Sequence, residues 1–321
     1  MTLPIVAPGS QLQTFRVGDK SVRLTFRREA ATGGLLIGKA PAAAVEIVAL
    51  VHNLCAAAHR GAARAALRLD PVPLDTRANA AELAAAHLMH LLVFTRATLG
   101  LAAVAPPVRL GDLARLLTPT TDAARAEARR LRLWLAGEPG GFDPDNADTA
   151  LPAADTPVRA LLAAVAAIET MTDGPVQPSS PRDWFCRVAG LDAIASARAV
   201  GLGAVGLRLY GRMIEAVRAL DALADDRDLE AFAPRAPAPG LGEAPAARGL
   251  LRHRAEIADG VVAAYAVDTP TAAMFAGELA AFLARLGGDD DRLIRLAIQT
   301  FDPCVPHRVD IEASEGACRH A

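Results

Sequence analysis

The chain has 321 residues, of which 52% are hydrophobic and only 4% aromatic, and its formal net charge is −2. This length is enough to bury a full-sized core, and a composition rich in alanine, leucine and valine favours close-packed helices over sheets. The nearly neutral charge provides no global field for binding nucleic acid or an anionic membrane. No uncharged apolar run reaches the roughly 20 residues that a membrane-spanning helix needs.

Cysteine usage indicates a reducing environment. The four cysteines are too few for a disulfide framework in a chain of this length. The first residues also lack the charged and apolar regions of a secretory signal. We therefore expect a cytoplasmic protein.

The first predicted element is a β-hairpin. Apolar and polar residues alternate over residues 22–27, which is typical of a half-buried strand, and residues 13–17 can pair with it across Gly18. Pro41 suits the first turn of a helix, and an alanine-rich helical segment continues to about Leu69. Further helices are expected over residues 78–98, 111–117, 122–136, 157–171 and 207–224.

The last third of the chain returns to a mixed pattern. Residues 234–245 carry four prolines and are expected to form an extended connector. Two strands over residues 251–257 and 261–267 are joined by Asp259-Gly260, a strong hairpin signal. Helices at 272–286 and 289–298 follow, and residues 308–321 are expected to be a mobile end.

Together these elements predict an α+β fold that is predominantly α-helical, with small β-hairpins. We expect one domain over residues 1–321, since no internal repeat or low-complexity segment divides the chain. Its parts are a hairpin and first helix at 10–69, a helical body at 70–232, and a hairpin with two final helices at 242–310.

Two short motifs carry metal-binding residue types. In a continuous helix, His52, Cys55 and His59 would share one face, so that a thiol and two imidazoles point at a common ligand. Taken alone, Cys55 is equally well explained as a small buried side chain. The second motif, Cys304-Val305-Pro306-His307, lies at the other end of the chain. Two cysteines and two histidines from these motifs would also form a sound structural zinc site.

The same motifs resemble those of nickel–iron hydrogenase large subunits. Residues 302–307 resemble the family's Asp-Pro-Cys-x-x-Cys, with histidine in place of the last cysteine. Residues 52–55 resemble its Cys-Gly-x-Cys, and His59 lies where the family has a histidine four residues later. Residues 243–249 resemble Glu-Ala-Pro-Arg-Gly, and residues 268–271 resemble the Pro-Thr element that follows. All four occur in the family's order.

The resemblance implies roles for these residues. In the family, four thiolates hold nickel and iron, and two of them bridge the metals. Cys55 matches a bridging cysteine and Cys304 a terminal nickel ligand, while His52 and His307 replace the other two. A neutral imidazole has one lone pair for a metal and cannot bridge two ions. We therefore expect no hydrogen-activating centre and no enzyme.

A short, cysteine-poor relative of this kind resembles the HupK/HoxV-type hydrogenase maturation proteins. That resemblance implies a trimmed large-subunit-like fold and a non-catalytic scaffold, which transiently holds the Fe(CN)2(CO) fragment before its transfer to the large subunit. The expected partners are a HypC-type maturation chaperone and the immature hydrogenase large subunit. The expected metal ligands are Cys55 and Cys304, with His52, His59 and His307 as further candidates, and the expected cofactor contacts are Arg248, Pro270 and Thr271.

Two alternatives from other classes stay open. One is a zinc-stapled structural or interaction protein with a degenerate hydrogenase-like fold. The other is a residual enzyme that binds a metal through His52, Cys55, Cys304 and His307.

Overall fold

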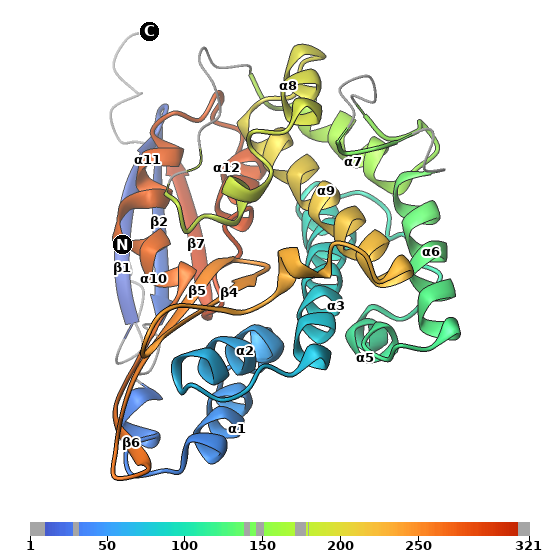
Figure 1. Ribbon diagram of the computed structural model, residues 1–321. Helices are drawn as coiled ribbons and strands as arrows, with labels where there is room; N and C mark the ends of the chain where they lie inside the picture. The colour runs from blue at the N-terminus through green and yellow to red at the C-terminus, as the bar shows by residue number, and fades with distance from the viewer. Residues whose placement is uncertain are drawn as a thin grey trace, which may run out of the picture.

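The computed structural model describes residues 10–27, 32–137, 142–145, 151–170, 178 and 180–313. Figure 1 shows a three-stranded sheet at one side of the molecule and the helices α3, α6 and α9 at the other. Strands β4 and β5 lie between these two parts, next to α2. The predicted class, α+β and predominantly helical with small antiparallel sheets, is confirmed.

The first sheet contains strands from both ends of the chain. The expected hairpin is formed by β1 (Ser10–Val17) and β2 (Lys20–Arg27), and Gly18 takes a positive φ at the turn. A third strand, β7 (His307–Ala313), pairs antiparallel with β2, from Phe26 opposite His307 to Lys20 opposite Ala313. The prediction of a mobile end from residue 308 is therefore wrong as far as 313, because β2 offers a free edge. The remainder lies outside the described residues.

The predicted helix over residues 41–69 is broken. Helix α1 (Pro41–Val51) is followed by a 3-10 turn (η2, Asn53–Cys55) and by α2 (Ala56–Ala66), and the two helical segments are bent by 98°. A carboxylate from the next helix supports the new start, since Glu82 Oε2 accepts a hydrogen bond of 2.9 Å from the Ala57 N–H. The shared-face geometry predicted for His52, Cys55 and His59 is therefore wrong. Within the described residues, no single helix is long and apolar enough to cross a membrane.

The helical body is built around one long helix. Almost every side chain of α9 (Ala204–Asp225) is buried, as expected of a helix that other elements surround. It contacts α3 (Pro73–Met89), α6 (Asp122–Ala136), α7 (Pro157–Ala166) and α8 (Asp192–Ala199). The remaining short elements are η1 (Thr32–Leu35), the π-helical η3 (His90–Thr95), α4 (Arg96–Thr98), η4 (Leu110–Asp112), α5 (Leu113–Leu117), η5 (Trp184–Arg187) and η6 (Leu229–Phe232).

The second sheet has the order β3-β4-β5-β6. Its strands are β3 (Arg235–Ala238), β4 (Leu241–Ala246), β5 (Gly249–Ala258) and β6 (Val261–Asp268). The β5–β6 hairpin is confirmed, and Asp259 and Gly260 both take positive φ, as the tight turn requires. The expected connector at 234–245 is extended, but most of it is paired in β3 and β4. Its prolines argued against paired strands, and their tertiary partners were not visible in the sequence.

The two final helices are confirmed with modified bounds. The first comprises α10 (Pro270–Ala273), the π-helical η7 (Met274–Glu278) and α11 (Leu279–Leu283). The second is α12 (Asp291–Gln299). Side chains cap both starts, because Thr269 accepts from the Ala272 N–H and Asp290 accepts from the Arg292 N–H. The loop at 300–306 then leads into β7.

Close packing of α2 on β4 joins the N-terminal and C-terminal parts of the chain. A Cβ on Gly242 would lie 1.9 Å from the carbonyl oxygen of Ala62. No real side chain tolerates that distance, so glycine is required at this position. The contact holds the second half of α2, the helix that begins directly after Cys55, against the sheet whose strands β4 and β5 flank Arg248.

Replacing Gly242 with alanine should therefore destabilise the protein. Overpacking of this kind costs about 1–3 kcal/mol, and here the obstacle is backbone, which yields less readily than a side chain. Urea unfolding followed by circular dichroism measures the loss. Gly190→Ala is the matched control, because a Cβ there meets nothing within 4 Å, and equal stability of both variants would contradict the prediction.

Candidate functional site

Both predicted cysteine motifs meet at one cavity. Cys55 ends the turn between α1 and α2, and Cys304 lies in the loop between α12 and β7. Both line a cavity of about 320 Å³, which we call the thiol cavity, and His52 and His59 line it as well. Four of the five predicted metal-binding residues are thus brought together from opposite ends of the chain, although the predicted helix is broken.

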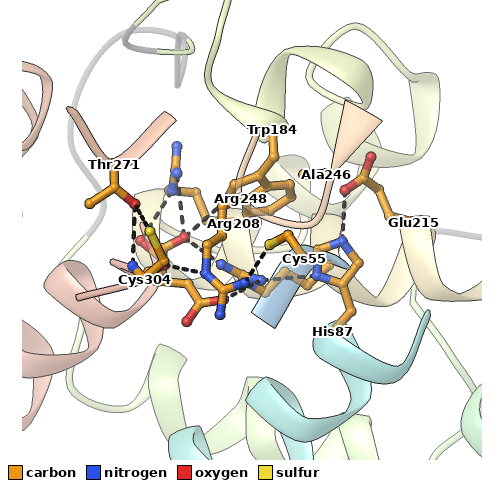
Figure 2. Close-up of polar contacts among 12 residues, drawn as sticks. Cys55, His87, Trp184, Arg208, Glu215, Ala246, Arg248, Thr271 and Cys304 are labelled. Atoms are coloured by element: carbon orange, nitrogen blue, oxygen red, sulfur yellow. Dashed lines mark hydrogen bonds and ion pairs between the residues drawn. The ribbon is translucent and has the colours of Figure 1, made fainter. Parts of the chain in front are cut away.

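Arg248 contacts both cysteine motifs (Figure 2). Its Nη1 donates to Cys55 Sγ at 3.0 Å, and its Nε donates to the carbonyl oxygen of Asp302 at 2.9 Å. Its Nη2 also lies 3.2 Å from Asp302 Oδ2. The guanidinium therefore links the first motif directly to the residue that opens the second.

Thr271 is the corresponding partner of Cys304. Its hydroxyl oxygen accepts from the Cys304 N–H at 3.2 Å and lies 3.0 Å from Cys304 Sγ. A hydroxyl group has one donor and two acceptor sites, so either the Thr271 hydroxyl or the Cys304 thiol can be the donor in the second contact. Each thiol of the cavity thus has a hydrogen-bonding side chain beside it, from a position that the sequence predicted.

Burial keeps the first thiol protonated. It raises the pKa of Cys55 to about 11, although the nearby Arg248 charge lowers it, and the Glu82 carboxylate adds a further increase. Burial disfavours the charge of Arg248, but nearby groups, first among them the Asp302 carboxylate, more than offset this, so the pKa of Arg248 lies above its ordinary value. A metal ion must therefore displace a proton from Cys55, and the thiolate so formed faces a cation.

Glu82 was not predicted as a site residue. It lies on α3, where its carboxylate accepts the Ala57 N–H, and burial raises its pKa to about 7 against the lowering effect of the Ala57 and Ala58 N–H groups. The available signal was one acidic residue in the middle of an alanine-rich helix. Its charge acts on Cys55 in the opposite direction to that of Arg248.

A buried network of charged and polar side chains contacts Asp302 through Arg212. Arg212 Nη1 lies 4.0 Å from Asp302 Oδ2 and 2.9 Å from His87 Nδ1, and His87 Nε2 lies 2.8 Å from Glu215. Glu215 is also paired with Arg187. Burial would raise the pKa of Asp302, but Arg248 and Arg212 outweigh it and lower the pKa below its ordinary value. Asp302 thus stays charged and holds Arg248 in place.

Three histidines form a connected group beside the cavity. The ring of His52 stacks on that of His59, with centroids 4.0 Å apart, and His52 Nε2 lies 3.2 Å from Thr32 Oγ1. His59 Nδ1 is 3.0 Å from His253 Nε2, and His253 Nδ1 is 2.6 Å from the Tyr265 hydroxyl. Sequence reasoning missed His253 and Tyr265, because neither lies in a spacing that indicates a metal site.

The other predicted residues lie elsewhere. His307 begins β7, is exposed, and has its Nδ1 3.1 Å from the Val305 carbonyl oxygen. It is not among the residues that line the thiol cavity. Pro270 is the first residue of α10 and is half-buried. Within the described ranges, no group of three or more His, Cys, Asp or Glu side chains is arranged to hold a metal ion.

Comparison with known proteins identifies the family. The hydrogenase expression/formation protein HupK of Rhodobacter capsulatus is 30% identical over 297 residues, which cover 89% of this chain and 91% of the relative. The chain belongs to the HupK family. The predicted resemblance to maturation proteins of this type is confirmed. No family model matches the chain.

Solved hydrogenases are similar to this HupK-family chain at low sequence identity. An NAD+-reducing [NiFe]-hydrogenase in the H2-reduced state matches with 15% identity and a TM-score of 0.46. The Ni-Fe-Se hydrogenase of D. vulgaris Hildenborough, in its as-isolated oxidized state, matches with 14% identity and a TM-score of 0.49. Each match covers 92% of this chain and 98% of the hydrogenase chain.

Removing the guanidinium should make Cys55 still harder to deprotonate. In Arg248→Met we expect the pKa of Cys55 to rise, so that iodoacetamide alkylates it more slowly, by about tenfold for each unit of pKa. Alkylation is followed residue by residue by mass spectrometry from about pH 8 to about pH 10. Arg254→Met, an exposed change on β5, is the control, and Cys186 is the internal reference. If the rate of Cys55 alkylation depended on pH in the same way in Arg248→Met and in the wild type, the proposed effect of Arg248 on the pKa of Cys55 would be contradicted.

Neutralising the Glu82 carboxylate should have the opposite effect and lower the pKa of Cys55. Glu82→Gln keeps an oxygen that can accept the Ala57 N–H but removes the negative charge that raises the pKa of Cys55. Above pH 7, where Glu82 is ionised, Cys55 should be alkylated faster than in the wild type. Glu46→Gln on the exposed face of α1 should have no effect, and a slower reaction in Glu82→Gln would overturn the prediction.

Proposed function

We propose that this chain is a non-catalytic scaffold in nickel–iron hydrogenase maturation, and that it transiently holds the Fe(CN)2(CO) fragment before transfer to the large subunit. Membership of a family of hydrogenase expression/formation proteins supports a maturation role. The proposal that the chain holds the iron fragment rests on the thiol cavity. There Cys55 and Cys304 line one space, and each is hydrogen-bonded to a different side chain.

The donor set suits one iron better than two metals. Among the described residues, the thiols that line the cavity are Cys55 and Cys304, whereas the Cys186 thiol donates to the carbonyl oxygen of Ser180. Two soft thiolates are appropriate ligands for a low-spin iron that already carries cyanide and carbonyl. A bimetallic centre would need further bridging sulfur, which an imidazole cannot replace.

The surrounding side chains suit the charge of the fragment. Cyanide ligands carry negative charge, and Arg248 can offset it with charge-assisted hydrogen bonds. The Thr271 hydroxyl, next to Cys304, can supply a second donor. Groups of this kind commonly influence metal affinity as much as the ligands themselves do.

The high pKa of Cys55 supports transient rather than permanent binding. At neutral pH a proton competes with the metal for this sulfur, so that binding is weaker than it would be at an acidic thiol. The Arg248 charge compensates in part once the thiolate has formed. A carrier needs such a balance, because it must both accept the fragment and release it.

The proposed partners are a HypC-type maturation chaperone, which delivers the fragment, and the immature large subunit, which receives it. Both would act in the cytoplasm. Val51 and Leu54 line the thiol cavity and are 44% and 57% exposed. The cavity wall is thus accessible at the surface, as a transfer between proteins requires.

Infrared spectroscopy of the protein purified together with its maturation machinery tests the proposal. We expect cyanide and carbonyl stretching bands in the wild type and their loss in Cys55→Ala and in Cys304→Ala, because each variant lacks a thiolate ligand. Cys186→Ala is the matched control and should keep the bands.

Other outcomes would favour the alternatives. Bands that persist in both ligand variants would contradict the proposed site. Stoichiometric zinc without such bands would favour the structural zinc protein, for which His307 would have to move toward the cavity. Hydrogen turnover by the purified chain would favour a residual enzyme.

A further inference from the structure

A chain of hydrogen bonds leads from the partly buried phenol of Tyr265 to the thiol cavity. The Tyr265 hydroxyl lies 2.6 Å from His253 Nδ1, and His253 Nε2 lies 3.0 Å from His59 Nδ1. His253 is completely buried, and His59 is 5% exposed and lines the cavity. Because His59 Nδ1 is bonded to His253, its Nε2 is the ring nitrogen left for the cavity.

The phenol determines the direction of this chain. Burial raises the pKa of Tyr265 above its ordinary value, so the hydroxyl keeps its proton. An imidazole nitrogen accepts a proton more readily than a phenol oxygen does, and a separation of 2.6 Å is short, as expected of an O–H donor. Tyr265 therefore donates to His253 Nδ1.

The tautomers of both histidines follow from that first bond. Burial lowers the pKa of His253 to about 3, so its ring is neutral and carries one N–H. With Nδ1 accepting, His253 carries its proton on Nε2 and donates to His59 Nδ1. Burial also lowers the pKa of His59, so this ring is neutral too and must then carry its own proton on Nε2, on the side of the cavity.

The reverse direction would give the opposite chemistry. If the Tyr265 oxygen accepted from His253, His59 would donate through Nδ1 and present a bare Nε2, which is a metal ligand. That direction would make the weakly acidic imidazole N–H the donor and the weakly basic phenol oxygen the acceptor, which is the less favourable of the two pairings.

We propose that Tyr265 and His253 hold His59 as the Nε2-protonated tautomer, so that His59 is a hydrogen-bond donor to an anionic group in the thiol cavity and not a metal ligand. The acceptor is a thiolate or a cyanide nitrogen, and only this identity rests on the proposed function. The parallel ring of His52, stacked at 4.0 Å, keeps the His59 ring in its plane. Tyr265 and His253 are thus positioning residues.

The tautomer can be read directly in the metal-free protein. The full chain is labelled with [15N]histidine, and long-range nitrogen–proton correlation NMR shows which ring nitrogens carry protons. The signals of His59 and His253 are assigned from their loss in His59→Gln and His253→Gln. We expect both residues to be protonated at Nε2 in the wild type.

Removing the phenol hydroxyl should remove the preference of His59 for one tautomer. In Tyr265→Phe we expect His59 to become a mixture of the two neutral forms. Tyr210→Phe is the matched control, because the chain has two tyrosines and the buried Tyr210 hydroxyl has no hydrogen-bond partner among the residues that the structure describes. The control should leave the His59 signals unchanged.

Two results would overturn the proposal. One is a wild-type His59 with its proton on Nδ1, which decides the matter even if Tyr265→Phe does not fold. The other is a folded Tyr265→Phe whose His59 tautomer equals that of the wild type. Absence of cyanide bands in the loaded wild-type protein would count against the proposed function alone, since the NMR experiment needs no iron.

Discussion

The site depends on one largely buried positive charge that contacts both cysteine motifs. Arg248 donates to Cys55 through one arm and to Asp302 through the other. A buried guanidinium is stable only with good partners, and Asp302 is itself kept ionised by Arg248 and Arg212. Loss of this pairing would remove the connection between the two cysteine motifs, even where the surrounding helices stay folded.

Local signals were sufficient for much of the fold. The Asp259-Gly260 turn fixed one hairpin through its backbone conformation, and α6 has the bounds that its apolar periodicity predicted. Elements stabilised by distant partners could not be predicted. The break before α2 depends on Glu82 of another helix, and β7 becomes a strand only because the edge of β2 is available.

The site also combines residues that could be predicted from the sequence with residues that could not. Cys55, Cys304, Arg248 and Thr271 could be placed from motif order, and the structure brings them together. The group around His59 could not, because its partner His253 is 194 residues away and lies on a strand that gives no metal-binding spacing. Helical periodicity suggested a common face for the three residues of the first motif. They reach the cavity instead through a bend of 98°.

Pairing of β7 with β2 has a consequence for how cargo would leave. The loop at 300–306 is anchored by α12 on one side and, immediately after it, by a strand inside a sheet. The two fixed ends of this short segment restrict how far Cys304 can move outward. Under the proposed function, handover would then proceed by exchange of ligands and protons at a nearly stationary sulfur, with the recipient protein approaching this surface and the carrier keeping its shape between one delivery and the next.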